Sequence, residues 1–159
     1  MKIGRLRLWI PWLRWCIWFG RCVPRVVLIR HADVTPGGGT DPPLNAAGVA
    51  RAEELRHVFG DTGIQAIFVS EFLRTQQTAA PLAGDLGLIP AVIADTVATV
   101  SAIRALPSSA AALVIGHTNT LPAIASGLGA SSFPTIGATE FDRLFVLNRG
   151  RLTALRYGA

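Results

Sequence analysis

The stretch Val26-Val27-Leu28-Ile29-Arg30-His31 indicates the fold of this 159-residue chain. Four apolar residues, three of them β-branched, stand directly before a basic pair. Such a short unbroken apolar run is typical of a strand buried in a parallel sheet. Similar runs follow at residues 66–69 and 112–115, and segments with helical spacing separate them. This alternation predicts an α/β fold of three layers, in which helices cover both faces of a mainly parallel sheet.

The other elements are predicted from capping and turn residues. Asn45 and Ser70 are of a type that caps helices, and they predict helices that extend to about residues 59 and 85. The first helix is expected to bury an apolar side made of Ala46, Val49, Ala50, Leu55 and Val58. Further elements are a short strand at 91–93, helices at 96–106 and 119–128, and a hairpin formed by 144–147 and 152–156.

The charge of the chain is unevenly distributed. Residues 1–22 contain five of the fifteen basic residues, none of the ten acidic residues, all four tryptophans and both cysteines. The rest of the chain therefore has ten basic and ten acidic residues, so the net charge of +5 gives no reason to expect a nucleic-acid partner. We divide the chain into a basic, tryptophan-rich segment, residues 1–24, and one domain, residues 25–158.

The role of the N-terminal segment has several alternatives. Pro11 and Arg14 interrupt its apolar stretches, so it does not offer the roughly 20 apolar residues of a transmembrane helix. It is either a disordered tail, a mis-assigned start, an anchor at the membrane interface or a degenerate export signal. We expect a cytoplasmic location for the domain, with membrane association or export through residues 1–22 as the alternative.

Basic side chains follow three of the predicted strands at the point where each strand ends. Arg30 and His31 follow the first strand, Ser70 with Arg74 one turn later follows the second, and His117 follows the strand at 112–115. Ligands bind beyond the carboxyl ends of strands in open α/β sheets. Arginine forks match phosphate oxygens, and neutral histidine can act as a nucleophile. The sequence therefore predicts a phosphate-handling site.

Several other chemistries lack their motifs. The sequence contains no H-E-x-x-H, no C-x-x-C, no P-loop motif and no G-x-S-x-G. We therefore expect neither a metal site nor an α/β-hydrolase. His57 lies within a predicted helix beside Arg56, and we expect a structural or exposed role for it.

The residues at the strand ends and their neighbours resemble the motifs of the histidine phosphatase superfamily, which has a phosphoglycerate mutase-like fold. Arg30-His31-Ala32 is similar to its Arg-His-Gly motif, and Gly116-His117 is similar to its second histidine motif. Residues 70–79 match its S-x-x-x-R-x-x-x-T-A pattern. The resemblance covers residues 25–157, and the compact length is similar to the short bacterial members that include phosphohistidine-protein phosphatases.

The resemblance implies a role for each matching residue. His31 would be the nucleophile that forms a phosphohistidine, and Arg30, Arg74 and His117 would hold the phosphoryl oxygens. No metal or organic cofactor would be needed. The substrate would be a phosphorylated small molecule or a phosphoprotein.

The proton donor of the family is not identified by its motifs in this chain. Only Asp95 lies in the region where many members carry a glutamate, and Thr118-Asn119 stands where other members carry an aspartate. Asp33 is a candidate general acid because it follows His31 by two residues. Glu140 and Asp142 are further candidates if their loop folds back over the site.

Two other functions are alternatives. The domain could be a non-catalytic module that binds a phosphate ligand, since the donor is missing from its usual place. The chain could also act chiefly at a membrane surface through residues 1–22. Release of phosphate from an aryl phosphate distinguishes catalysis from both.

Removal of residues 1–22 should leave a folded domain whose rate on small phosphate esters is unchanged, because no proposed site residue lies in that segment. Circular dichroism and a phosphate-release assay check this result. An unfolded or inactive truncated protein would show that the segment belongs to the core.

Overall fold

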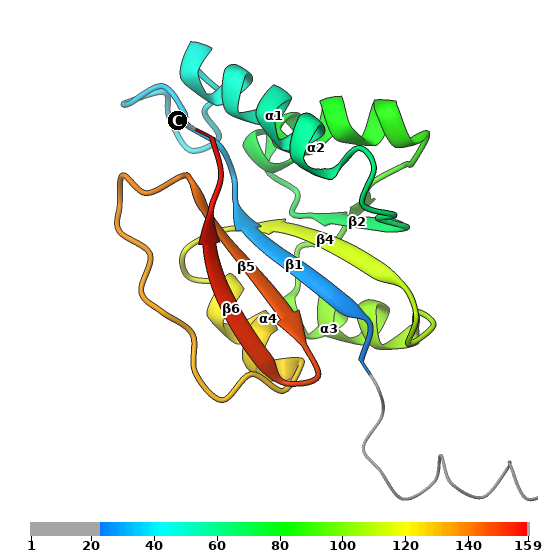
Figure 1. The fold of residues 1–159 in the computed structure, drawn as a ribbon. Coiled ribbons are helices and arrows are strands. Elements are labelled where there is room, and N and C mark those ends of the chain that lie inside the picture. The colour runs from blue at the N-terminus through cyan, green and yellow to red at the C-terminus, as the bar shows by residue number, and fades with distance from the viewer. Residues whose placement is uncertain (1–22, 159) are drawn as a thin grey trace, which may run out of the picture.

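The computed structural model describes residues 23–158, and residues 1–22, to which the alternatives for the N-terminal segment apply, lie outside the described residues. Six strands form one sheet between two pairs of helices (Figure 1). In chain order the strands are β1 (Arg25–Arg30), β2 (Ala66–Val69), β3 (Ala91–Val92), β4 (Ala111–Gly116), β5 (Arg143–Asn148) and β6 (Arg151–Arg156). Their order across the sheet is β3-β2-β4-β1-β5-β6.

The predicted strand directions are confirmed. Strands β3, β2, β4 and β1 pair in parallel, while β5 is antiparallel to β1 and forms a hairpin with β6. Arg149 and Gly150 connect the hairpin with φ angles of 50° and 77°. Two residues with positive φ suit the right-handed twist of the flanking strands.

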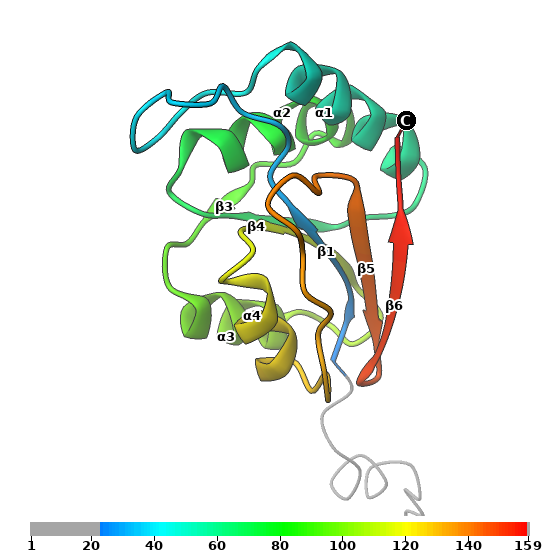
Figure 2. The ribbon, with the colours of Figure 1, turned by 90° about the vertical axis from the view of Figure 1, so that its left-hand side faces the viewer.

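The apolar run of β1 contacts both helical layers, which explains why it contains no polar residue. Val26 and Leu28 pack toward α3 (Thr96–Ala105) and α4 (Leu121–Gly127). Val27 and Ile29 pack toward α1 (Ala46–Phe59) and α2 (Leu73–Leu86). Figure 2 shows the two helix pairs on opposite sides of the sheet. Burial of each such side chain contributes about 1.5–3 kcal/mol.

The predicted apolar side of α1 is wrong at four of its five positions. Leu55 is buried, but Ala46, Val49, Ala50 and Val58 are exposed. The buried side is instead made of Gly48, Ala52, Leu55 and Phe59. These residues recur at helical spacing. The prediction included Leu55 but not Gly48, which allows a close approach instead of supplying a side chain.

Ser70 does not cap α2. The helix begins at Leu73, and its N-cap residue Phe72 makes no side-chain capping bond. The carboxylate of Asp41 accepts a hydrogen bond from the Leu73 N–H instead, at 3.0 Å. A loop more than thirty residues earlier in the chain therefore caps this helix, which frees Ser70 for another contact. The cap predicted at Asn45 is confirmed, since its side chain accepts from the Gly48 N–H.

No helix within residues 23–158 has the length and apolar character of a membrane span.

Two glycine-to-alanine substitutions should have opposite effects on stability. A Cβ at Gly48 would overlap the carbonyl oxygen of Asp33, whereas a Cβ at Gly84 in α2 would meet no atom. Gly48→Ala should lower the free energy of unfolding by about 1–3 kcal/mol. Gly84→Ala should raise it by about 0.5–1 kcal/mol because helical glycine is entropically unfavourable. Urea unfolding measures the free energy of unfolding of both variants. An equal change in the two would show that α1 does not approach the Asp33 loop this closely.

Candidate active site

An open pocket of about 480 Å³ lies where the parallel strands end. His31 directly follows β1, Ser70 follows β2 and His117 follows β4, and these strands are neighbours in the sheet. The pocket is lined by His31, Ser70, Glu71, Phe72, Arg74, Ala94, His117, Thr118, Asn119 and Thr120. The structure therefore brings three of the predicted site residues, His31, Arg74 and His117, into one pocket.

His31 is held in a defined tautomer. Its Nδ1 lies 2.8 Å from the carbonyl oxygen of Ala32, and the side chain is almost fully buried. A carbonyl oxygen can only accept, so Nδ1 carries the proton and Nε2 keeps its lone pair. The Ala32 N–H donates to Thr78 Oγ1 at 2.9 Å, which ties this loop to α2. Nε2 of His31 is thus the atom available for nucleophilic attack.

Both site histidines are neutral at pH 7. Burial lowers the pKa of His31 to about 4, and the charges of Arg30 and Arg74 lower it further, against the hydrogen bond to Ala32. Burial also lowers the pKa of His117 to about 4, with Arg74 as the next cause. The rings lie 5.3 Å apart between centroids, so two positive charges there would repel each other.

His117 is positioned by the segment that follows β2. Its Nε2 shares a 2.9 Å hydrogen bond with Ser70 Oγ, and Thr75 Oγ1 lies 3.0 Å from the same hydroxyl. The backbone N–H of His117 donates to Thr120 Oγ1. Because Nε2 is engaged with Ser70, Nδ1 is the nitrogen of His117 that is left to contact a ligand.

Arg30 does not line the open pocket and lies beside His31. Its guanidinium stacks on Phe141 at 4.0 Å from the ring centroid. Nη1 donates to the carbonyl oxygens of Gly137 and Ala138, at 3.0 and 2.7 Å. Its Nε is buried and has no hydrogen-bond partner within residues 23–158. One edge of Arg30 thus anchors the loop before β5, while one donor is left free.

Arg74 has a matching arrangement on the other side of the pocket. Its guanidinium stacks on Phe72 at 4.3 Å, and Phe72 contacts the His117 ring edge-on at 5.2 Å. Phe141 contacts His31 with the two rings tilted by 52° and 5.7 Å between their centroids. Arg74 also forms a long ion pair of 3.4 Å with Asp41. Each arginine is therefore aligned by an aromatic ring that also packs on a histidine.

The acidic residues considered as proton donors are engaged elsewhere. Asp33 Oδ2 accepts from Arg51 Nε at 2.6 Å, and Asp33 does not line the pocket. Asp95 caps α3, and Glu140 and Asp142 pair with Arg156. The role of Asp33 as general acid stays a prediction that its ion pair disfavours.

Several contact residues were missed by the sequence analysis. Ser70 was assigned to a helix cap, and Glu71, Phe72 and Phe141 were not considered. Ser70, Glu71 and Phe72 lie between the end of β2 and Arg74, so their position in the motif could have indicated them. Phe141 could not be found in this way, because only the path of the loop before β5 brings it to His31.

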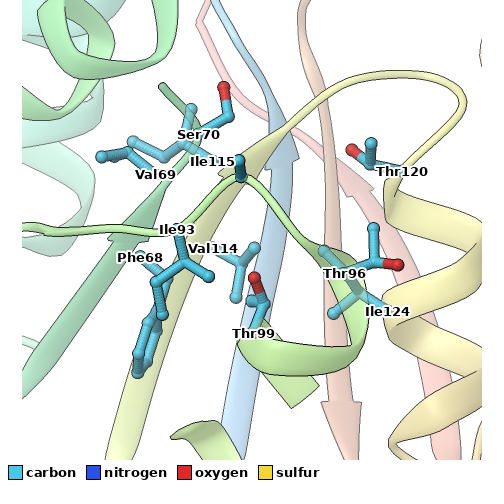
Figure 3. Close-up of a pocket in the computed structure, with 11 residues that line it drawn as sticks. Phe68, Val69, Ser70, Ile93, Thr96, Thr99, Val114, Ile115, Thr120 and Ile124 are labelled. Atoms are coloured by element: carbon cyan, nitrogen blue, oxygen red, sulfur yellow. The ribbon is translucent and has the colours of Figure 1, made fainter. Parts of the chain in front are cut away.

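A smaller, mainly apolar cavity of about 20 Å³ adjoins the pocket and shares Ser70, Ala94 and Thr120 with it (Figure 3). It has room for about one water molecule. Its other walls include Phe68, Ile93 and Val114. No charged residue lines it, in contrast to the open pocket. In the described part of the chain no cluster of three His, Cys, Asp or Glu side chains could hold a metal ion.

Comparison with known proteins shows which family and which solved structures this chain is similar to. Residues 26–98 match the profile of the histidine phosphatase superfamily (branch 1). This match supports the resemblance to the superfamily, and the phosphoglycerate mutase-like fold expected from the motifs is confirmed. A curated relative, the PE-PGRS family protein PE_PGRS11 of Mycobacterium tuberculosis, is 39% identical over 74 residues. That match spans 41% of this chain and only 12% of the relative.

Solved structures share the fold over nearly their whole length. The putative phosphohistidine phosphatase SixA from Agrobacterium tumefaciens has a TM-score of 0.59 at 24% identity, covering 86% of this chain and 97% of that one. A protein histidine phosphatase SixA complexed with tungstate has a TM-score of 0.66 at 22% identity, covering 84% and 95%. A mycobacterial glucosyl-3-phosphoglycerate phosphatase has a TM-score of 0.65 at 14% identity, covering 86% and 99%.

The two site histidines should stay neutral well below the usual histidine range. Their pKa values of about 4 predict that their ring Cε1–H signals in NMR stay constant from pH 8 down to ~5.5. The unfolded chain binds more protons between pH 6.5 and 4, so the free energy of unfolding should fall as pH falls through that window. His31→Ala and His117→Ala assign the signals. Midpoints near 6.5 would contradict the burial of these rings.

Proposed function

We propose that this protein is a metal-independent phosphatase that hydrolyses a phosphomonoester or a phosphoprotein through a phosphohistidine on His31. The observation that carries the proposal is a neutral, buried histidine whose Nδ1 is bound to a carbonyl, in one pocket with Arg74 and His117. A phosphorylated substrate supplies the negative charge for which these basic groups are arranged.

In the first step, Nε2 of His31 attacks the phosphorus and the bond from phosphorus to the leaving oxygen breaks. The lone pair is available because the low pKa keeps the ring neutral. As Nε2 bonds to phosphorus the ring becomes positive, and the Ala32 carbonyl that accepts from Nδ1 stabilises this charge. The leaving oxygen takes up a proton.

The phosphoryl oxygens are assigned to Arg30, Arg74 and His117. Arg30 supports this role through its buried Nε, a donor that lacks a partner within residues 23–158. Arg74 can exchange its long contact with Asp41 for a shorter one to phosphate. Nδ1 of His117 is available as a further contact because Ser70 holds Nε2. Phosphoryl transfer depends mainly on such positioning and charge stabilisation.

In the second step, water attacks the phosphohistidine, inorganic phosphate leaves and His31 returns to its neutral form. The site residues need no metal for either step. Related folds support the substrate class, since one is a protein histidine phosphatase seen with tungstate, itself an oxyanion, and another is a phosphatase of glucosyl-3-phosphoglycerate. A non-catalytic phosphate-binding module is the alternative that the next experiment tests.

His31→Ala should abolish release of phosphate from an aryl phosphate, because the acceptor of the phosphoryl group is gone. Acid quenching of the wild type should trap an acid-labile phosphoryl group that the variant lacks. His57→Ala is the matched control, since His57 is an exposed histidine on α1, and it should keep the wild-type rate. Turnover by His31→Ala at the wild-type rate would exclude the phosphohistidine route. A wild type that binds phosphate without turnover would favour the binding module.

A further inference from the structure

Glu71 is an acidic side chain in the lining of the active-site pocket that no role described above uses. It stands between Ser70 and Phe72, which both contact the His117 ring. Its own carbonyl oxygen accepts from Gln76 Nε2 at 2.9 Å, so the backbone at this position is held. Among the described residues its carboxylate forms no ion pair, unlike Asp33 and Asp41.

The charge of Glu71 acts on the site. Its carboxylate raises the pKa of His117 against the larger effect of burial, which shows that it lies within electrostatic reach of that ring. Glu71 is exposed, whereas His31 is only 6% exposed. His31 is thus buried and Glu71 faces solvent, and both residues line the same pocket.

This arrangement matches the geometry of the reaction. In phosphoryl transfer the attacking and leaving atoms lie roughly in line on opposite sides of phosphorus. A phosphoryl group attacked by the buried His31 would direct its leaving oxygen toward solvent, where Glu71 lies. We propose that Glu71 is the general acid that protonates the leaving oxygen, an assignment that rests on the phosphatase function proposed above.

The protons balance over the two steps. Glu71 first takes a proton from solvent. As the P–O bond then breaks, the leaving oxygen takes this proton from the Glu71 carboxylic acid, giving an alcohol and a carboxylate. In the second step the Glu71 carboxylate takes a proton from the attacking water as its oxygen bonds to phosphorus. Phosphate leaves, and both Glu71 and His31 regain the forms that they had before the P–O bond broke.

Glu71→Gln tests the assignment through the dependence of rate on the leaving group. The full-length variant and the wild type are compared on a series of phosphate esters, from 4-nitrophenyl phosphate to simple alkyl phosphates. General acid catalysis contributes ~10²–10⁴-fold and matters most for poor leaving groups. The variant should therefore lose at least ~10²-fold on alkyl esters and less than ~10-fold on the nitrophenyl ester.

Two matched variants distinguish proton donation by Glu71 from other effects of a substitution. Glu54→Gln makes the same change at an exposed glutamate on α1 that lines a different cavity, and it should leave every rate unchanged. Asp33→Asn breaks the Arg51 ion pair, and it should slow all esters by a common factor if Asp33 only holds its loop.

An equal loss on all esters in Glu71→Gln would mean that Glu71 orients His117 or the substrate, and would overturn the assignment. No loss on any ester would overturn it as well. A selective alkyl loss in Asp33→Asn but not in Glu71→Gln would move the role to Asp33. A wild type that hydrolyses no ester and traps no phosphoryl group would instead refute the phosphatase function, and the donor role with it.

Discussion

The parallel pairing of β1 with β4, and of β4 with β2, is the constraint on which the site depends. In the observed register Arg30 lies opposite Gly116, and Val69 lies opposite Ile115. Strands β1, β2 and β4 therefore end within about one residue of each other. The His31 N–H still donates to the Gly116 carbonyl oxygen, at 2.9 Å. A shift by one residue would turn each side chain to the other face and separate the histidines.

The apolar surroundings of the site set the chemistry of its charged groups. Phe141 and Phe72 each cover one arginine and one histidine, so they exclude water while they align the guanidinium planes. Loss of water disfavours the charged form of both imidazoles more strongly than any single neighbour does. The same packing thus keeps both histidines neutral beside the two guanidinium groups.

The sequence predicted the strands and the positions of His31, Arg74 and His117 well, because these depend on local apolar runs and on strand ends. It failed where a distant segment supplies the partner. Asp41 caps α2 in place of Ser70, and Phe141 reaches His31 from another loop. The buried side of α1 was misplaced because Gly48 packs through the absence of a side chain. The ion pair of Asp33 with Arg51 could not be inferred from spacing.

The double role of Asp41 affects which anions the pocket can accept. Its carboxylate accepts a hydrogen bond from the Leu73 N–H and also forms the ion pair with Arg74. An incoming anion must therefore compete with a carboxylate that a helix end holds in place. A singly charged ester carries the same charge as the Asp41 carboxylate, so its attraction to Arg74 is no stronger. A doubly charged phosphate is attracted to Arg74 more strongly than Asp41 is. In the proposed phosphatase, this competition at Arg74 would favour a doubly charged phosphate over a singly charged ester, whatever the rest of the substrate is.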